Sequence, residues 1–250
     1  MYDMIYSSKQ NPIIKGINSL KEKKYRDLNK QFIVEGIKMV NEAIKYGIPI
    51  NKIVVTEKMK AEILPNDFPL MEVSDEVFSF ISDAVNPQGA LAVLDIPAVT
   101  PKPPDGSSIL LDGIRDPGNL GTIMRTAAAA GYKEIYLLNC CDAYNSKVIR
   151  SSMSGIYFVK LYEVSEAETA ILLKDIPVII ADMCGENVFK FVPPAKYCIV
   201  IGNESNGVSG YMRSRADYTV SIPMDSKVES LNAGISCAVL MYQLKYYKGV

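Results

Sequence analysis

The most constraining feature of this 250-residue chain is a strand in its middle that turns directly into an alanine-rich helix. The apolar residues 109–111 predict the strand, and the polar residues 116–119 predict a turn that connects it to the helix. The helix is expected to end at Gly131. Asn119 can cap this helix, and Arg125 follows a little under two helical turns later. Both side chains are therefore expected to face one site at the carboxyl end of a strand, where open α/β sheets bind ligands. An ordinary capped strand–turn–helix connection is the alternative.

Two later segments repeat this organisation and weaken that alternative. Residues 198–208 form an apolar strand that runs into a polar loop between Gly202 and Gly207. A third short strand, at 220–224, leads through a polar stretch into residues 230–232 and a long apolar helix.

Strands and helices alternate along the whole chain, which predicts an α/β fold. In the second half, near-continuous apolar strands between helices indicate a parallel sheet covered on both faces. Its strands are expected near 108–112, 134–138, 156–160, 177–180, 197–201 and 219–222, and its helices near 119–130, 146–153, 165–174, 208–214 and 230–247. The first half predicts helices at 13–30, 37–46 and from Ser74, with strands at 32–36, 53–55 and 90–94.

A proline-rich segment separates the two halves. Four prolines lie between Pro97 and Gly106, and this composition predicts a semi-rigid linker. We therefore expect an N-terminal α/β domain over 1–96, a linker over 97–106 and a C-terminal domain over 107–250.

The composition excludes several classes of site. The chain has no histidine, which removes Ser-His-Asp and Cys-His mechanisms and the usual mixed Cys/His zinc site. Its five cysteines form no C-x-x-C pair, so buried reduced thiols and no metal are expected. No stretch approaches the ~20 apolar residues that span a membrane, and the N-terminal residues lack the pattern of a signal peptide. These observations predict a cytoplasmic protein without a membrane partner.

The distribution of charge is uneven. The formal net charge is −1, but residues 1–30 carry seven basic side chains against three acidic ones. A surface that faces phosphates is one interpretation, and a solvated helix face is an equally good one.

The three blocks of the second half, in this order and spacing, resemble the three sequence motifs of the SpoU branch of the SPOUT methyltransferases. The resemblance implies a C-terminal α/β domain with a deep trefoil knot and S-adenosyl-L-methionine as cofactor. It implies transfer of a methyl group to a ribose 2′-hydroxyl of RNA. It also implies a homodimer joined through the C-terminal domain, with each active site completed across the interface.

The first half is similar to the substrate-binding domain that precedes many SpoU methyltransferases, which itself resembles L30e-like RNA-binding modules. Residues 11–15, 32–36 and 86–93 carry this similarity. It favours ribosomal RNA, and 23S ribosomal RNA in particular, over transfer RNA. Together with the charge pattern, it makes the following residues candidates for RNA contacts: Lys15, Lys23, Lys24, Arg26, Glu35 and Arg150.

The resemblance also distributes roles around the site. Gly202, Ile222, Met224 and Leu231 match positions that line the family's cofactor pocket, although the three apolar residues would otherwise be read as core. Gly202 is expected to let the backbone approach the ligand closely.

Arg125 matches the residue with the central role in catalysis. Because an arginine stays protonated, we expect Arg125 to bind a phosphate or the ribose oxygen and to stabilise the developing negative charge. Glu204 is the carboxylate candidate for the proton acceptor, or else it holds Arg125 or Asn119 in place. Asn119, Ser230 and Asn232 are expected to orient the ribose and the loops.

Three other functions remain open at this point. A transfer-RNA 2′-O-methyltransferase would share all these motifs. A non-catalytic RNA-binding homologue would have lost the catalytic groups, and a small-molecule enzyme would not need the basic N-terminal segment. Salt-sensitive RNA binding separates the last two, because phosphate contacts release counterions.

Overall fold

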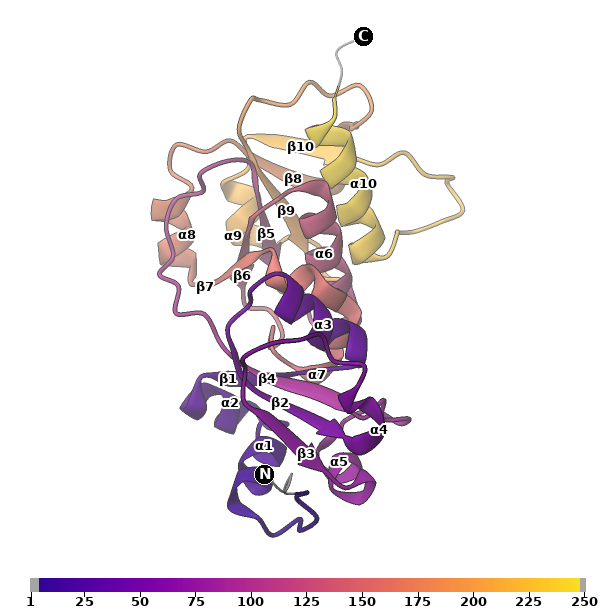
Figure 1. Cartoon of the computed structure of the whole chain (residues 1–250). Coiled ribbons are helices and arrows are strands. Elements are labelled where there is room, and N and C mark those ends of the chain that lie inside the picture. Colours follow the sequence, from indigo (N-terminus) through magenta and orange to yellow (C-terminus); the bar gives the residue numbers. More distant parts are fainter. Residues whose placement is uncertain (1–4, 248–250) are drawn as a thin grey trace. The chain divides into compact units, whose positions relative to one another are not determined.

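The computed structural model of the chain describes residues 5–247 and divides into two compact units (Figure 1). The first unit comprises the chain up to Ala98 together with Tyr144–Tyr157, and the second comprises the rest. The sequence pattern assigns 144–157 to the second half, whereas the structure groups this segment with the first unit. Residues 1–4, on which the expected lack of a signal peptide partly depends, lie outside the described range.

The first unit is built on a four-stranded sheet in the order β1-β4-β2-β3. Strand β4 (Ala90–Asp95) lies between β1 (Gln31–Glu35) and β2 (Ile50–Thr56) and pairs antiparallel with both. Strand β3 (Leu70–Val73) adds to β2 in the parallel direction. The pattern of the first half therefore predicted three of these strands, and β3 was not predicted because its four residues carry only a weak alternation.

The helix expected over 13–30 is wrong in its continuity. The structure has α1 (Pro12–Ser19), capped by the Asn11 side chain, then a turn at Leu20, then α2 (Lys23–Asn29), which ends on the left-handed residue Lys30. Leu20 at this turn is buried with Ile14 and Ile17 of α1, and Arg26 of α2 donates to the carbonyls of Leu20 and Lys21, so these carbonyls are satisfied without a continuous helix. The other helices of this unit are α3 (Ile37–Lys45), α4 (Glu57–Lys60), α5 (Asp75–Ile81), α7 (Ser146–Ser152) and the 3-10 helix η1 (Met153–Tyr157).

The core of the first unit lies between the sheet and the helices α1 and α5. Ile14 and Ile17 of α1 pack with Val77, Phe78 and Ile81 of α5, and all five side chains are buried. Each such side chain contributes about 1.5–3 kcal/mol to stability. The helix predicted from Ser74 is confirmed as α5, and Ser74 caps it, since its side chain accepts from the N–H of Val77.

The second unit contains a six-stranded, wholly parallel sheet, as predicted. The order is β10-β8-β9-β5-β6-β7, and β5 lies next to β9 although their sequences are far apart. All residues of the central strand β5 are buried, which is why its sequence reads as one apolar run. The strands are β5 (Ser108–Asp112), β6 (Glu134–Leu138), β7 (Lys160–Val164), β8 (Val178–Asn187), β9 (Cys198–Gly202) and β10 (Tyr218–Ser221).

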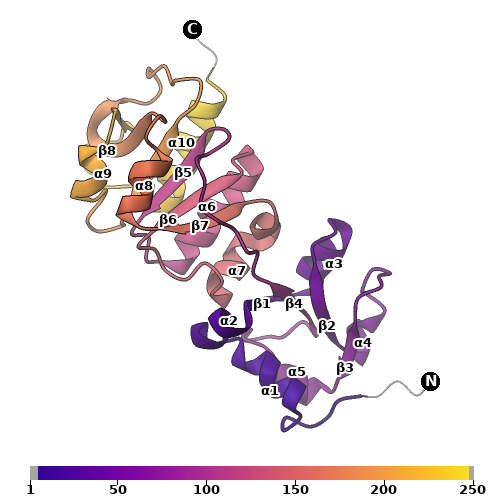
Figure 2. The same ribbon diagram turned by 90° about the vertical axis from the view of Figure 1, so that its left-hand side faces the viewer.

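Helices cover both faces of this sheet. Figures 1 and 2 show α8 (Glu166–Leu172) and α9 (Gly210–Ser214) on one face, with α6 (Pro117–Ala130) and α10 (Ala233–Lys245) on the other. The α8/α9 face encloses a buried cluster in which Tyr136 and Tyr162 stack. Because all six strands run parallel, their carboxyl ends lie at the same edge of the sheet, and the loops that follow the strands gather there.

Two expectations for this half of the chain are wrong in detail. Residues 156–160 were expected to be a strand, but η1 occupies 153–157 and the strand begins at Lys160. The left-handed backbone at Met153 starts this tight helix, and apolar content alone does not distinguish it from a strand. Asn119 was expected to cap α6, but the cap is Asp116, whose side chain accepts from the N–H of Asn119.

Within residues 5–247, no helix has the length and apolar character to cross a membrane, and no three or more metal-binding side chains cluster together. The five cysteines are free thiols. Burial raises the pKa of Cys198 to about 12, so this thiol stays protonated and unreactive.

Candidate active site

A cleft of about 580 Å³ lies in the second unit at the carboxyl ends of β9 and β10, beside residues 181–183 of β8. These residues follow Ile180, where the pairing of β8 with β9 ends. The loop 202–208 and the segment that leads into α10 complete the wall of the cleft. The predicted site residues among its lining are Gly202, Glu204, Ile222, Met224, Ser230, Leu231 and Asn232. The structure therefore brings together all four candidates for the cofactor and three of the five candidates for catalysis.

Gly202 ends β9 and is tightly enclosed by the loop that follows it. A Cβ atom at this position would lie 2.1 Å from the carbonyl carbon of Gly207 and 2.2 Å from the backbone nitrogen of Val208. No real side chain tolerates such contacts, so the loop 202–208 closes only on a glycine. The close approach that the sequence suggested is thus made by the protein's own backbone.

Asn119, in the first turn of α6, connects the three motifs through its side chain. Its Nδ2 donates to Oε1 of Glu204 at 2.9 Å, and its Oδ1 accepts from Nδ2 of Asn232 at 2.8 Å. Its amide group is thereby fully oriented, and the residue is buried although it does not line the cleft. One asparagine thus fixes the loop after β9 and the start of α10 against α6.

Glu204 is held mainly by donors. Besides Asn119, the backbone N–H groups of Arg115 and Asp116 donate to its carboxylate, at 3.3 and 3.2 Å. Burial alone would raise the pKa of Glu204, but these hydrogen bonds outweigh it and hold the pKa below its usual value. The carboxylate is therefore ionised at neutral pH and weakly basic.

Asn203, which is not among the predicted site residues, shapes the loop that carries Glu204. Its Oδ1 accepts from the N–H groups of Ser205 and Asn206, and its Nδ2 donates to the carbonyl of Gly113 at 2.8 Å. Its backbone pairs in both directions with Gly207, whose φ is +68°. An asparagine four residues before a glycine after a strand is a turn signal that could have identified it.

Arg125 lies on α6 but does not reach the cleft of its own chain. A spacing of six residues rotates Arg125 by about 240° around the helix relative to Asn119, so the two side chains leave α6 in different directions. Asn119 is buried, whereas Arg125 is exposed and forms no hydrogen bond or ion pair with any residue of the described range 5–247. Within one chain, therefore, this guanidinium is separate from the other predicted catalytic groups.

Asn232 combines a site position with a structural task. Its Oδ1 accepts from the N–H groups of Gly234 and Ile235 and caps α10, while its Nδ2 is the donor to Asn119. Ser230, two residues earlier, is exposed on the wall of the cleft. The cap fixes the direction in which the 222–232 segment enters α10.

Asp182 and Arg213 were not predicted, yet both line the cleft. Arg213 Nη1 lies 2.5 Å from Asp182 Oδ2, and Arg213 Nε donates to the carbonyl of Val208 at 3.0 Å. Asp182 comes just after the apolar run 177–180, so a carboxylate at a strand end was available as a signal. Arg213 offered no comparable signal.

The candidate RNA contacts lie in the first unit, and they fall into two groups. The exposed group consists of Lys15, Lys23, Lys24 and Arg150. Lys23 pairs with Asp27 at 2.8 Å, and Arg150 Nη1 donates to the carbonyl of Asp83 at 3.5 Å. All four side chains lie on the surface of the first unit.

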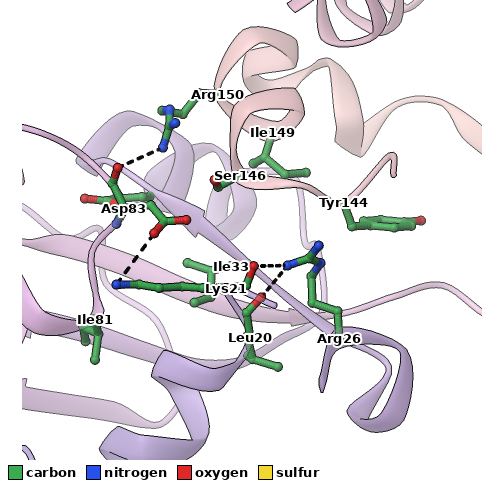
Figure 3. A pocket seen from close by; sticks show the side chains of 11 residues that line it. Leu20, Lys21, Arg26, Ile33, Ile81, Asp83, Tyr144, Ser146, Ile149 and Arg150 are labelled. Atoms are coloured by element: carbon green, nitrogen blue, oxygen red, sulfur yellow. Dashed lines mark hydrogen bonds and ion pairs between the residues drawn. The ribbon is translucent and has the colours of Figure 1, made fainter. Parts of the chain in front are cut away.

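Arg26 and Glu35 form the second group and are used inside the unit, around the small pocket of Figure 3. Arg26 is buried, and its Nη1 donates to the carbonyls of Leu20 and Lys21 at 2.7 Å each. Glu35 accepts from the hydroxyl of Ser82 and from the N–H of Asp83. Both side chains therefore make hydrogen bonds that hold turns of the first unit in place.

Two family models match the chain. The model described as the SpoU rRNA Methylase family covers residues 106–242, which is more than half of the chain. The chain belongs to this family. A second model, the MRM3-like substrate binding domain, matches residues 11–92. The resemblances stated for both halves from their sequence motifs are confirmed.

Curated relatives and a solved structure agree with this membership. The 23S rRNA (guanosine(2553)-2′-O)-methyltransferase RlmP of Bacillus subtilis is 27% identical over 95% of this chain and 98% of its own length. The 23S rRNA (uridine(2479)-2′-O)-methyltransferase of Streptomyces viridochromogenes is 27% identical over 85% of this chain and 82% of its own. An AdoMet-bound rRNA methyltransferase from Sinorhizobium meliloti superimposes with a TM-score of 0.85, at 26% identity over 96% of each chain.

Proposed function

We propose that this SpoU-family protein is an RNA (ribose-2′-O-)-methyltransferase that takes its methyl group from S-adenosyl-L-methionine. The observation that carries the proposal is the hydrogen-bonded chain Asn232–Asn119–Glu204, which joins the three motifs beside an open cleft. The curated relatives described above are named as ribose 2′-O-methyltransferases, and the structural relative is described as AdoMet-bound.

The residues of the cleft fit the proposed cofactor. Ile222, Met224 and Leu231 offer apolar walls for an adenine ring, and the loop closed on Gly202 offers backbone amides and carbonyls. When bound, S-adenosylmethionine supplies an electrophilic methyl group on its sulfonium. What the chain adds is a fixed orientation for the acceptor, because well-oriented reactants account for much of the acceleration of such a transfer.

Two charged residues have separate roles in this proposal. Arg125 binds the phosphate or the ribose oxygen and stabilises negative charge as the hydroxyl loses its proton. Glu204 is a positioning residue, because its lowered pKa makes it a poor proton acceptor and its oxygens already hold Asn119 and the turn at Arg115–Asp116. Ser230 and Asn232 contact the ribose from the wall of the cleft.

The position of Arg125 supports a homodimer as part of this proposal. Helix α10 packs against α6, which carries the exposed Arg125. Ile235 and Tyr242 of α10 and its C-cap residue Tyr246 have 52%, 45% and 57% of their surfaces exposed. Their spacing of seven and four residues places them on one face of α10. A second copy of the chain seated on this apolar face would bury it and would supply Arg125 to the partner's cleft.

Ribosomal RNA is the proposed substrate, and 23S ribosomal RNA in particular. The two curated relatives act on a guanosine and a uridine of 23S RNA, so the shared target is the ribose and not a particular base. Lys15, Lys23, Lys24 and Arg150 of the substrate-binding unit are the candidates for phosphate contacts. Transfer RNA is the second candidate, and the proposed location is the cytoplasm.

The substrate class is tested by incubating the protein with labelled S-adenosylmethionine and separate unmodified 23S, 16S and transfer RNAs. We expect label in 23S RNA and background in the others. Label in transfer RNA alone would overturn the ribosomal assignment. The variant Arg125→Ala should lose methyl transfer while it still binds S-adenosylhomocysteine. If the parent protein binds RNA or a ribosomal precursor particle but transfers no methyl group to any of them, a non-catalytic homologue is favoured.

A further inference from the structure

Strand β8 contains an interruption that the function described so far does not explain. In its pairing with β10, Ile180 lies opposite Thr219, but the next paired residue of β8 is Glu186, opposite Val220. Residues 181–185 therefore leave the ladder and bulge out at the cleft. Bulges of this kind concentrate next to active sites, where they redirect a side chain.

Glycine makes the return of this bulge to the sheet possible. A Cβ atom at Gly185 would lie 2.5 Å from the carbonyl carbon of Val220, so only glycine fits where the chain rejoins β10. The hydroxyl of Ser221 donates to the carbonyl of Gly185 at 2.8 Å and fixes the same point. The bulge is thus a defined part of the fold.

The bulge carries Asp182 into the wall of the cleft. The N–H of Cys184 donates to Oδ1 at 3.0 Å, and Arg213 Nη1 holds Oδ2 at 2.5 Å. The backbone donor, opposed by burial and assisted by Arg213, lowers the pKa of Asp182, so the carboxylate is ionised. Each oxygen of a carboxylate accepts about two hydrogen bonds, and each oxygen here has one acceptor position left for the cleft.

We propose that Asp182 accepts hydrogen bonds from the 2′- and 3′-hydroxyls of the cofactor's ribose, and that Arg213 is the positioning residue that orients this carboxylate. The inference rests on the proposed function, since it assigns a part of the same cofactor cleft. A vicinal diol offers two donors to two carboxylate oxygens, and in dinucleotide-binding folds an acidic residue that follows a sheet strand is the common partner of ribose hydroxyls. Asp182 has a comparable place, two residues after β8 ends its pairing with β9 at Ile180. Arg213 Nε also donates to the carbonyl of Val208, so Arg213 connects Asp182 to the loop 202–208 that closes on Gly202.

The test measures binding of three ligands by calorimetry to the parent protein and to Asp182→Asn. The ligands are S-adenosylhomocysteine, 5′-methylthioadenosine, which lacks the amino-acid end, and 2′,3′-dideoxy-5′-methylthioadenosine, which also lacks the diol. We expect Asp182→Asn to weaken the first two by the same factor, about 10- to 100-fold, because a charged acceptor is lost. The dideoxy ligand should bind both proteins equally.

A matched control removes a nearby charge outside the cleft. Glu186→Gln, on β8 just after the bulge, should leave all three affinities unchanged. Arg213→Lys keeps the charge but loses the planar fork, and it should weaken the diol-bearing ligands and spare the dideoxy ligand. A purely structural role of Arg213 would weaken all three ligands alike and would overturn its assignment as a positioning residue.

Other outcomes overturn the main inference in distinguishable ways. Loss of affinity for S-adenosylhomocysteine without loss for methylthioadenosine would place Asp182 at the amino-acid end of the cofactor. Equal binding of every ligand by Asp182→Asn and the parent, with matching thermal unfolding, would remove Asp182 from cofactor recognition. Failure of the parent protein to bind S-adenosylhomocysteine at all would instead contradict the proposed function, and the inference with it.

Discussion

The role of Glu204 at the candidate site depends on the hydrogen bonds that its carboxylate accepts. Its sequence position suggested either a proton acceptor or a positioning group, and the sequence could not separate the two. The separation depends on donors from Arg115, Asp116 and Asn119, which lie far from Glu204 along the chain. Such contacts are set by the tertiary fold, so no local pattern reports them.

The substitution Glu204→Gln should lower kcat/KM about 10- to 100-fold, because it loosens Asn119 and the turn before α6. The shape of the pH–rate profile should not change, since a group with a lowered pKa is already ionised over the working range. Steady-state methylation rates between pH 6 and pH 9 check this. Loss of an ascending limb in the variant would make Glu204 the base.

The same carboxylate makes a pH-dependent contribution to stability. A carboxyl group whose pKa is lower in the folded state stabilises the fold above its ordinary pKa of 4.5, and that contribution is lost as the pH falls through the folded-state pKa. The difference in unfolding free energy between parent and Glu204→Gln should therefore be present at pH 7 and vanish in acid. It should be no more than about 1 kcal/mol, because the group is largely exposed. A difference that grows in acid, in urea titrations, would contradict the assignment.

At the scale of elements, the prediction was accurate for strands that are continuous buried apolar runs. It was less accurate for elements whose bounds depend on contacts with distant parts of the chain. All of β5, β6 and β9 follow from continuous apolar sequence. The break between α1 and α2 depends instead on the hydrogen bonds of Arg26 to the turn. The bulge in β8 depends on the close packing of Gly185 against β10. The trefoil knot implied by the family stays a prediction, since it concerns how loops thread and not how any one element forms.

The loop 202–208 offers a direct test of an element. Gly202→Ala places a Cβ within 2.1 Å of the Gly207 backbone, so it should destabilise the fold by about 3 kcal/mol or abolish cofactor binding. The matched control is Gly210→Ala, eight residues later at the start of α9, where nothing lies within 4 Å of the added atom. Thermal unfolding and S-adenosylhomocysteine titration of both variants check this. Equal behaviour of the two would show that the loop tolerates the side chain.

The whole molecule combines a substrate-binding unit with a methylase unit, and the composition allowed this division to be proposed. The predicted domain bounds differ from the compact units in the segment Tyr144–Tyr157, which groups with the first unit although it lies beyond the proline-rich segment and within the residues that match the SpoU model. Contacts that connect distant stretches of chain in this way leave no trace in local periodicity.

The proposed dimer predicts complementation between two inactive variants. Arg125→Ala lacks the guanidinium, and Met224→Arg fills the cofactor cleft. If each site takes Arg125 from the partner, mixed dimers contain one intact site, and co-expression should restore about one quarter of the parent activity. No recovery in dimers verified by sedimentation would mean that each chain uses its own Arg125.

The most direct test of the central claim is the position of the transferred methyl group. RNA methylated by the protein with labelled S-adenosylmethionine is digested in alkali, which cleaves next to every free 2′-hydroxyl. A methyl group on the ribose blocks cleavage at its own linkage, so we expect label in an alkali-resistant dinucleotide. Label recovered in mononucleotides would place the methyl group on a base and would contradict ribose methylation.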